Sequence, residues 1–475
     1  MMIIIFLVAT LIIGGWLFFN RSTFVNYFLL ITYLALLWFF GIYEYQHLNI
    51  TELEFFKPDA LGILLLFALG VVSIPAIFHG YRYISTRNEP PKSRGIFFAA
   101  MIMLITACSM VYISNHIAVI WIFVEITTIS ASVLIYHHRN MNALEGVWKY
   151  VFICAISITF IYIGILFLSL SLEQAGVEDM SFDSIYQNFD KLNLFWLKLS
   201  FLFIFTGFTA KLGLVPMYTA GIDAKDKAPG PAGALLASVL MNVGFVGIYR
   251  VYAIMTHTPL HSWASTIILI AAVLSVFVAT VYMTRIKNIK RMFAYSGIEH
   301  MGLVMLGLAA GGIGVYAAIL HIILHTFVKP SLFFQYNQIY RIYQSKSIYD
   351  VGNYFKYNKA GAIVVLLGFI SATAMPPSGL FISEFLIFQS LFEGHYILIL
   401  LSVLVLLTMI IWGFGSNIFK LLFTPPMIVN ENKIPRISPW ESLSQYILLA
   451  FSVYLAYNPP VIFVNLIQDA VKLIQ

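Results

Sequence analysis

Lys211-Leu-Gly-Leu-Val-Pro216 and Ala374-Met-Pro-Pro-Ser-Gly-Leu-Phe-Ile-Ser-Glu384 interrupt two long apolar runs of this chain. A proline inside such a run removes a backbone donor and breaks the helix. Broken transmembrane helices at matching places of two repeats are typical of ion pathways. Lys211 precedes the first break and Glu384 follows the second, each within about two turns, and charged groups at membrane depth are generally functional. The sequence therefore predicts a membrane protein that moves ions.

The composition supports a polytopic membrane protein. Of the 475 residues, 60% are hydrophobic and only 10% are charged, and the mean hydropathy is +0.89, which is too apolar for a soluble core. Apolar runs of about 20 residues are long enough to cross a bilayer as helices. We therefore expect an all-α fold with about fourteen transmembrane helices. They are predicted to start near residues 2, 25, 60, 95, 115, 147, 194, 229, 261, 293, 312, 362, 396 and 441.

The loops predict the orientation. Every second loop is basic, as in residues 82–94, 285–291 and 341–359 and at Lys225 and Lys227, and the loops between them are neutral or acidic, as in residues 44–59 and 173–190. Because Lys and Arg accumulate on the cytoplasmic side, both termini are expected on the non-cytoplasmic side of a prokaryotic cytoplasmic membrane. The net charge of +6 then reflects topology, and the lipid bilayer rather than nucleic acid is the expected partner of the surface.

Helix spacing predicts two inverted repeats. Helices four to eight (residues 95–254) and nine to thirteen (residues 255–424) have similar lengths, and the fourth helix of each unit is the broken one. Five helices is an odd number, so the second unit starts on the opposite side of the membrane, as in inverted-topology repeats. Residues 1–94 are expected to form three flanking helices, and residues 425–475 the fourteenth helix and a tail.

Glu125 and Lys211 are the predicted proton site of the first repeat. Glu125 lies mid-helix, and its charged form is costly in hydrocarbon unless an ammonium stabilises it. Lys211 lies in the turn before Pro216, where the break exposes backbone to water and side chains. A carboxyl–lysine pair that forms and separates can exchange protons. Two alternatives remain open: a protonated Glu125 bonded within the bundle, and a Lys211 that snorkels to the interface.

His321, His325 and Lys329 are predicted to form the relay of the second repeat, because their i, i+4, i+8 spacing places them on one helix face. Glu384 would pass the proton on, on the outer side. The histidine pair can also hold zinc, but the sequence shows no third ligand, so no metal is predicted, and core histidines satisfied by helix contacts are a further alternative. Two buried cysteines cannot supply an iron–sulfur cluster, and no cofactor is predicted.

Four secondary candidates complete the set of ionisable or polar residues. Lys149 and Glu145 lie near the start of the sixth helix, where Lys149 has the alternative role of an interfacial anchor. His300 follows Glu299 on the tenth helix, and Asn242 lies on the eighth. Each is predicted to assist proton transfer at membrane depth.

Several motifs resemble the antiporter-like subunits shared by respiratory complex I, Mrp-type cation/proton antiporters and membrane-bound group four hydrogenases. The resemblance extends over nearly the whole chain, and within this family the stretch around Lys149 and the Asn at 242 look most like component F of the formate-hydrogenlyase-type hydrogenases. The matching motifs are Trp121 to Glu125 with Thr-Thr after it, Glu145-Gly-Val-Trp-Lys149-Tyr, Lys211-Leu-Gly-Leu-Val-Pro216-Met, Ala228-Pro-Gly-Pro-Ala-Gly-Ala-Leu-Leu236, Lys290-Arg-Met-Phe-Ala-Tyr-Ser296, His321 through Lys329, and Pro376-Pro-Ser-Gly379 with Ser383-Glu384-Phe.

The resemblance implies one half-channel in each repeat, joined by a polar axis along mid-membrane. By position, Glu125 matches the fifth-helix glutamate and Lys211 the lysine of the broken seventh helix. Asn242 departs from the family, because many members have a lysine or histidine there, so the link between the half-channels is expected to depend on water. Asn288 and Pro330 are further departures.

We therefore expect a subunit that translocates protons or Na⁺ and is driven by a redox module in other membrane-complex subunits, while carrying no redox centre itself. The alternative is a subunit of a Mrp-type cation/proton antiporter or another ion-coupled transporter without redox partners. A third interpretation is a scaffold whose half-channels are vestigial. The proteins that co-purify with the chain distinguish the first two.

Overall fold

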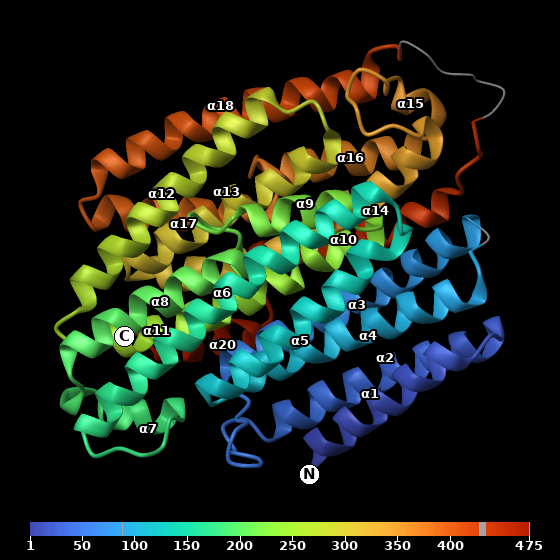
Figure 1. Cartoon of the computed structure of the whole chain (residues 1–475). Helices are drawn as coiled ribbons and strands as arrows, with labels where there is room; N and C mark the ends of the chain where they lie inside the picture. Colours follow the sequence, from blue (N-terminus) through green and yellow to red (C-terminus); the bar gives the residue numbers. More distant parts are fainter. Residues whose placement is uncertain (88, 427–433, 475) are drawn as a thin grey trace.

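The secondary structure of the described residues is almost entirely helical. The computed structural model describes residues 1–87, 89–426 and 434–474, and over these ranges the long helices run side by side in one bundle (Figure 1). Residues 427–433, part of the predicted C-terminal segment, lie outside the described residues. The β-pairing within the described ranges is limited to isolated bridges such as that between Phe56 and Ser114. The predicted all-α fold class is confirmed.

The first half of the chain contains eleven α-helices within the described residues: α1 (Met2–Phe19), α2 (Thr23–Gln46), α3 (Ala60–Thr86), α4 (Pro91–Ile113), α5 (Ile117–Ile135), α6 (Met141–Gln174), α7 (Phe182–Gln187), α8 (Leu194–Leu212), α9 (Thr219–Lys227), α10 (Gly230–Leu236) and α11 (Val239–Thr256). The second half continues with α12 (His261–Arg285), α13 (Ile289–Ala310), α14 (Ile313–Tyr343), α15 (Tyr354–Tyr357), α16 (Lys359–Ala372), α17 (Gly379–Glu393), α18 (Ile397–Phe423), α19 (Leu443–Tyr457) and α20 (Val461–Val471).

The membrane-spanning helices agree closely with the predicted starts. Twelve spans of the described chain are long and apolar enough to cross a membrane, or thirteen if the bent pair formed by α19 and α20, which meet at 71°, is one span. The count of fourteen is not confirmed. The difference lies at α16 and α17, which are 14 and 15 residues long and flank Pro376 and Pro377. The inverted repeats and the segment boundaries stay predictions.

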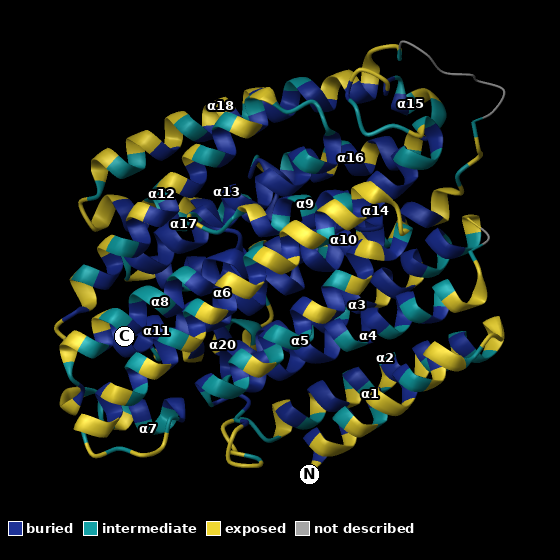
Figure 2. Ribbon diagram, in the orientation of Figure 1, coloured by how far each residue is buried: buried dark blue, intermediate teal, exposed yellow. Residues whose placement is uncertain are grey.

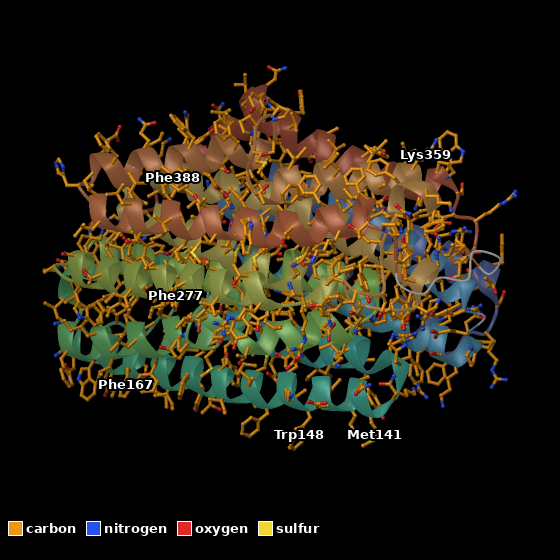
Figure 3. The ribbon with its side chains drawn as sticks, turned by 90° about the horizontal axis from the view of Figure 1, so that it is seen from above. Met141, Trp148, Phe167, Phe277, Lys359 and Phe388 are labelled. Carbon is orange, nitrogen blue, oxygen red and sulfur yellow. The ribbon has the colours of Figure 1, made fainter. Side chains whose placement is uncertain are left out.

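The bundle has lipid-facing outer helices and a fully enclosed centre. The best spanning windows of α13, α14 and the α10–α11 pair are entirely buried, whereas that of α18 is 28% buried, and Figure 2 shows this contrast between centre and edge. On the outer helices large apolar side chains such as Leu398 and Trp412 are exposed. Figure 3 shows Met141 and Trp148 of α6 pointing away from the bundle. Apolar faces such as these are stable against the hydrocarbon of a bilayer. The burial of polar residues at the centre of the bundle is not explained in this way and needs another reason.

Both predicted helix breaks are present. α8 ends at Leu212 and is followed by Gly213, whose φ of +87° lies in the left-handed region that favours glycine. Beyond it, the Val215 N–H donates to Ser275 Oγ at 3.0 Å. In the second break Ser378 caps α17, because its Oγ accepts from the Phe381 N–H at 3.3 Å. The chain thus leaves and re-enters helical structure within the bundle at both places.

A close approach fixes α11 against α8. A Cβ placed on Gly244 would lie 2.4 Å from the backbone nitrogen of Leu212, so only glycine allows the two helices to pack at this distance. The contact holds the break after α8 next to the middle of α11.

The two ends of the bundle carry different charges. One end has a basic cavity of about 390 Å³, lined among others by Arg87, Lys227, Lys290 and Lys346. The other end has a mixed-charge cavity of about 450 Å³, whose charged lining residues include Lys57, Asp59, Arg250 and Asp469. The first cavity includes Tyr83 near the end of α3 and the second Asp59 at its start, which are about 36 Å apart along a helix. The cavities therefore lie on opposite sides of the membrane region.

Both termini lie at the mixed-charge end. The Met1 ammonium donates to Glu52 Oε2 at 2.7 Å, and Glu52 lies in the loop between α2 and α3, next to the cavity wall at Asn49. At the other terminus Asp469 and Lys472 line the mixed-charge cavity directly.

Candidate functional site

The first break buries Lys211 among hydroxyl groups. Lys211 is 4% exposed, and its Nζ donates to Thr128 Oγ1 at 2.7 Å and to Tyr150 OH at 3.2 Å. The ammonium is therefore held inside the bundle by α5 and α6 and does not snorkel to the interface. The thiols of Cys108 and Cys154 lie within its electrostatic reach.

Glu125 is near Lys211 but does not contact it. Glu125 lies on α5 one turn before Thr128 and is half-buried, and its charge reaches Lys211. Among the described residues no ion pair within 4 Å joins the two, and the Lys211 ammonium donates to Thr128 Oγ1 instead. The predicted pair is thus separated in this structure.

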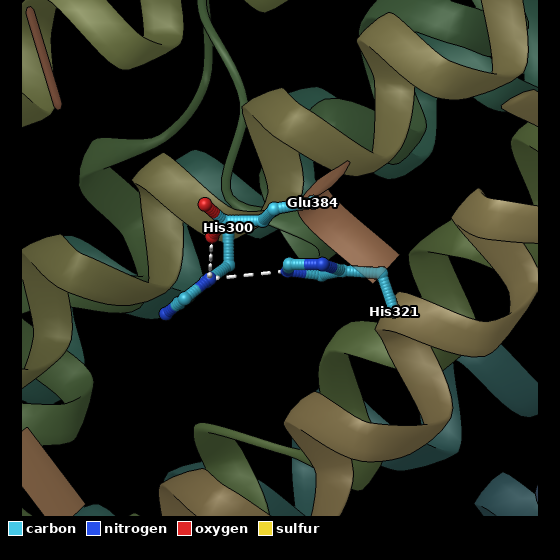
Figure 4. A group of neighbouring side chains, drawn as sticks. All are labelled: His300, His321 and Glu384. Carbon is cyan, nitrogen blue, oxygen red and sulfur yellow. Dashed lines mark hydrogen bonds and ion pairs between the residues drawn. The ribbon is translucent and has the colours of Figure 1, made fainter. Parts of the chain in front are cut away.

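The second break brings two histidines and a carboxylate together (Figure 4). His300 Nδ1 lies 3.1 Å from His321 Nε2 and 3.8 Å from Glu384 Oε1. Beyond it, His321 Nδ1 lies 3.0 Å from Ser383 Oγ. His300, a secondary candidate from the sequence, therefore stands between α14 and α17 and connects their predicted site residues.

The tautomer of His321 follows from these contacts. The Ser383 hydroxyl donates to the carbonyl of Leu380 at 3.0 Å, so its oxygen accepts from His321 Nδ1–H. His321 Nε2 then carries a lone pair towards His300, and we assign the proton of that contact to His300 Nδ1. The result is a directional chain of hydrogen bonds that runs from α13 through α14 to α17.

His325 and Lys329 continue the same face of α14. The His325 ring lies 5.3 Å from that of His300, centroid to centroid, and its two ring nitrogens have no partner among the described residues. The Lys329 ammonium donates to Ser296 Oγ and lies within electrostatic reach of Glu299. The predicted stripe of His321, His325 and Lys329 is thus fully buried, with no exposed surface on any member.

Asn242 links the two halves of the chain. Its Nδ2 donates to Thr326 Oγ1 at 2.9 Å, and its Oδ1 lies 3.2 Å from the same hydroxyl, which can donate to it. Thr326 is the residue after His325 on α14. Tyr112 of α4 also lies within hydrogen-bonding reach of Asn242, so the amide makes polar contacts with both α4 and α14.

Lys225 belongs to the buried group, although the sequence analysis assigned it to a basic loop. It lies on α9, is 3% exposed, and its Nζ donates to Met241 Sδ at 3.2 Å. Its charge reaches both His325 and Lys329. The useful signal was its position nine residues after Pro216, because the second half of a broken helix returns to membrane depth.

Lys149 and Glu145 lie outside this group. Their side chains pair with each other at 2.5 Å and are 48% and 57% exposed on the outer face of α6. A longer contact of 3.8 Å joins Lys149 to Asp223. These two secondary candidates are surface residues that do not meet the buried chain.

The described buried residues connect the two cavities. Asp226, the residue after Lys225, lines the basic cavity. At the opposite end Arg250 lines the mixed-charge cavity, pairs with Asp59 at 2.9 Å and donates to the carbonyl of Tyr112 at 2.9 Å. Since Tyr112 lies beside Asn242, polar or ionisable groups follow one another from one end of the bundle to the other.

This fold and site define a polytopic membrane protein with a buried line of titratable side chains between two broken helices. The family model described as "NADH:quinone oxidoreductase/Mrp antiporter, TM" matches residues 114–410. The chain belongs to this family, and the resemblance expected from its motifs is confirmed. It is an antiporter-like membrane subunit.

Curated relatives come from several complexes. The chain is 26% identical to a hydrogenase-4 component F homolog of Methylacidiphilum infernorum (isolate V4) over 417 residues, which is 86% of each protein. It is 24% identical to hydrogenase-4 component B of Escherichia coli (strain K12), over 71% of this chain but only 51% of that protein. With the NADH-quinone oxidoreductase subunit M of Rickettsia prowazekii (strain Madrid E) it shares 23% identity over 63% of its length and 60% of that subunit.

Solved structures share the fold over the full length. A chain of the archaeal membrane-bound sulfane sulfur reductase superposes with a TM-score of 0.86 at 19% identity, covering 100% of this chain and 96% of that one. A chain of the Mrp complex from Dietzia sp. DQ12-45-1b gives a TM-score of 0.85 at 13% identity, over 100% and 97%. A chain of respiratory complex I from Thermus thermophilus gives 0.78 at 16% identity, over 98% of each.

Proposed function

We propose that this chain translocates protons across a prokaryotic membrane as the antiporter-like subunit of a redox-driven complex. The observation that carries the proposal is the buried line of titratable side chains between the two cavities. Lys211, Lys225, Lys329, His300 and His321 are each at most 4% exposed. Charged or titratable groups at membrane depth are costly and mark ion pathways.

The chemistry of this line suits protons better than Na⁺. Imidazole and ammonium groups take up and release protons, whereas a bare alkali cation needs a shell of oxygen ligands. The hydrogen-bonded chain from His300 through His321 to Ser383 is a path on which a proton can hop without movement of the backbone. Glu384, 3.8 Å from His300, can accept or release the proton at the His300 end of that path.

Transfer between the repeats is proposed to run through Lys225 and Asn242. Lys225 supplies a cation within electrostatic reach of the α14 relay, and Asn242 offers an amide that exchanges hydrogen bonds with Thr326. In the first repeat, approach of Glu125 to Lys211 would stabilise the protonated lysine, and their separation would favour release. This motion is the proposed gate.

The relatives support a redox-driven complex as the setting. The most extensive match among the relatives reported above is named as a homolog of a hydrogenase-4 component, and others are named as subunits of NADH-quinone oxidoreductases. Partner subunits in the membrane follow from this family membership. The basic end, with Arg87 and Lys346, is proposed to face the cytoplasm, so both termini lie on the other side.

A cation/proton antiporter without redox partners is the second candidate, because the Mrp-complex chain superposes with a TM-score of 0.85. Mass spectrometry of the complex pulled down in mild detergent through a tag on the N-terminus separates the two. Hydrogenase or quinone-reductase subunits are expected; recovery of small hydrophobic subunits alone would favour the antiporter.

Proton movement itself is tested on the purified complex in proteoliposomes with a pH-sensitive dye. Lys329→Met removes a buried ammonium of similar volume and is expected to lower proton uptake about 100-fold, the usual scale for loss of a proton-transfer group. Lys198→Met is the matched control, since Lys198 is an exposed lysine on α8. Equal uptake by both variants would show that the α14 relay does not carry protons.

A further inference from the structure

We propose that His300, His321 and Glu384 form a binding site for a divalent transition-metal ion of the Zn²⁺ type, and that the ion blocks the relay when bound. One ligand atom from each residue lies within 4.8 Å of the others. The three residues come from α13, α14 and α17, so the site exists only in the folded bundle (Figure 4).

Two of the three spacings between the ligand atoms are close to those around a tetrahedral ion, and the third, from His321 to Glu384, is within 4.8 Å. Zinc binds imidazole nitrogen at about 2.0–2.1 Å, so two ligand atoms of a tetrahedral site lie about 3.4 Å apart. The distance from His300 Nδ1 to His321 Nε2 is 3.1 Å, and that to Glu384 Oε1 is 3.8 Å. Shifts of a few tenths of an ångström therefore bring both contacts to the tetrahedral value.

The donor set selects the metal. Two imidazoles and one carboxylate suit Zn²⁺, Cu²⁺ or Ni²⁺, whereas Mg²⁺ and Ca²⁺ prefer oxygen-only shells. A site with three protein ligands keeps a fourth position open. His325 lies beside His300, at 5.3 Å between ring centroids, with both nitrogens unpartnered among the described residues, and is the side chain that we assign to that position.

The surroundings already prepare His321 as a ligand. Its Nδ1–H is held by Ser383, and a second hydrogen bond of this kind fixes the tautomer of metal-bound histidines and directs the other nitrogen to the metal. His300 has to change tautomer, because its Nδ1 carries the proton in the relay. Its Nε2 can take that proton, since neutral imidazole carries one proton on either ring nitrogen.

An unpartnered polar atom in the group is a second, independent sign of a missing ligand. Glu384 Oε1 is buried without a hydrogen-bond partner in the described part of the chain, and Glu384 is 6% exposed while both histidines are fully buried. An ion would therefore reach the site from the side of Glu384. Buried polar groups without partners are uncommon. A bound metal ion would be coordinated by the carboxylate oxygen and would give it the partner that it lacks.

The fold thus supplies what the sequence lacked for a metal site. His321 and His325 alone offered two imidazoles without a third ligand. His300 and Glu384 complete the set from helices that are separated from His321 by 21 and 63 positions in the chain. Ion binding does not depend on the proposed function; the block of the relay does, because the ion occupies the lone pairs through which a proton would pass.

The test uses the full-length chain in lipid nanodiscs, stripped of metal with a chelator and titrated with Zn²⁺ against a chromophoric competitor. Wild-type chain is expected to bind one tightly held Zn²⁺, and His300→Gln to lose it. Ser383→Ala, which removes only the orienting hydroxyl, is expected to weaken binding about 10–100-fold. His261→Gln is the control, because His261 is an exposed histidine on α12.

X-ray absorption of the wild-type zinc complex needs no variant and keeps the test independent of folding defects. Two imidazole nitrogens and a carboxylate oxygen at about 2.0–2.2 Å are expected in the first shell. A shell without histidine, or the same affinity in wild type and His300→Gln, would overturn the proposal. Tight binding with unchanged proton uptake would overturn the blocking step alone and would count against the relay.

Discussion

Replacement of Lys225 by methionine is expected to stabilise the protein and to stop proton transfer. Lys225 is 3% exposed, and its ammonium donates to a thioether, Met241 Sδ. Among the described residues no carboxylate lies within 4 Å of it. A buried ammonium costs several kcal/mol of desolvation. Met has nearly the same length, so no cavity term opposes the gain.

The magnitude follows from these terms. Loss of the contact to Met241 Sδ at 3.2 Å lowers the free energy of unfolding by about 1 kcal/mol at most. Removal of the buried charge raises the free energy of unfolding by several kcal/mol. The net effect is a stabilisation of about 2 kcal/mol. Proton uptake by the reconstituted complex should fall about 100-fold, because a proton-transfer group is gone from the junction.

The assay combines thermal unfolding of the purified chain in detergent with dye-detected proton uptake in proteoliposomes. Lys198→Met, at an exposed position of α8, is expected to leave both quantities unchanged. Uptake at the wild-type rate in Lys225→Met would place Lys225 off the pathway. A loss of uptake together with a lower unfolding temperature would mean that Lys225 is structural, and the reasoning from unpaired charge would be refuted.

Three further changes test neighbouring parts of the site. Thr128→Val removes the hydroxyl that accepts from Lys211 at 2.7 Å; we expect slower uptake with assembly intact, and an unchanged rate would remove Thr128 from the gate. Asn242→Leu breaks the amide bridge between the repeats and should uncouple them, seen as redox turnover without proton uptake in vesicles; coupled turnover would contradict this. Gly244→Ala places a Cβ 2.4 Å from the backbone of α8 and should lower the free energy of unfolding by about 1–3 kcal/mol, whereas Gly15→Ala, with open space around it, should be neutral in the same thermal measurement.

Much of the fold follows from the lengths of the apolar segments and from the prolines that interrupt them. The sixth predicted start differs most from the structure, residue 147 against Met141, because the polar residues of the first two turns of α6 conceal its beginning. The prolines correctly marked the breaks, since the limits that proline sets on the backbone act locally. The number of spans was less predictable, because α16 and α17 are each too short to span alone.

The site was predictable only in part, because a sequence shows helix faces but not which helices meet. The stripe of His321, His325 and Lys329 depends on spacing within α14 and was visible. Its junction with His300 depends on the packing of α13 against α14, which no local pattern encodes. Lys225 was misassigned for the opposite reason, since its charge resembled a topology signal while its backbone belonged to a broken helix.

Three lysines at membrane depth are hard to explain by stability. Lys211 is bonded to two neutral hydroxyls, Lys329 to one, and Lys225 to a sulfur, and their exposures are 4%, 0% and 3%. Buried ammonium groups that only held the fold together would be expected to contact carboxylates, because a buried charge without one is destabilising. Neutral partners leave each lysine able to lose its proton at modest cost, which is what a relay needs. The carboxylates Glu125 and Glu299 stand nearby without contact, so a small approach of either one changes the charge state that its lysine prefers.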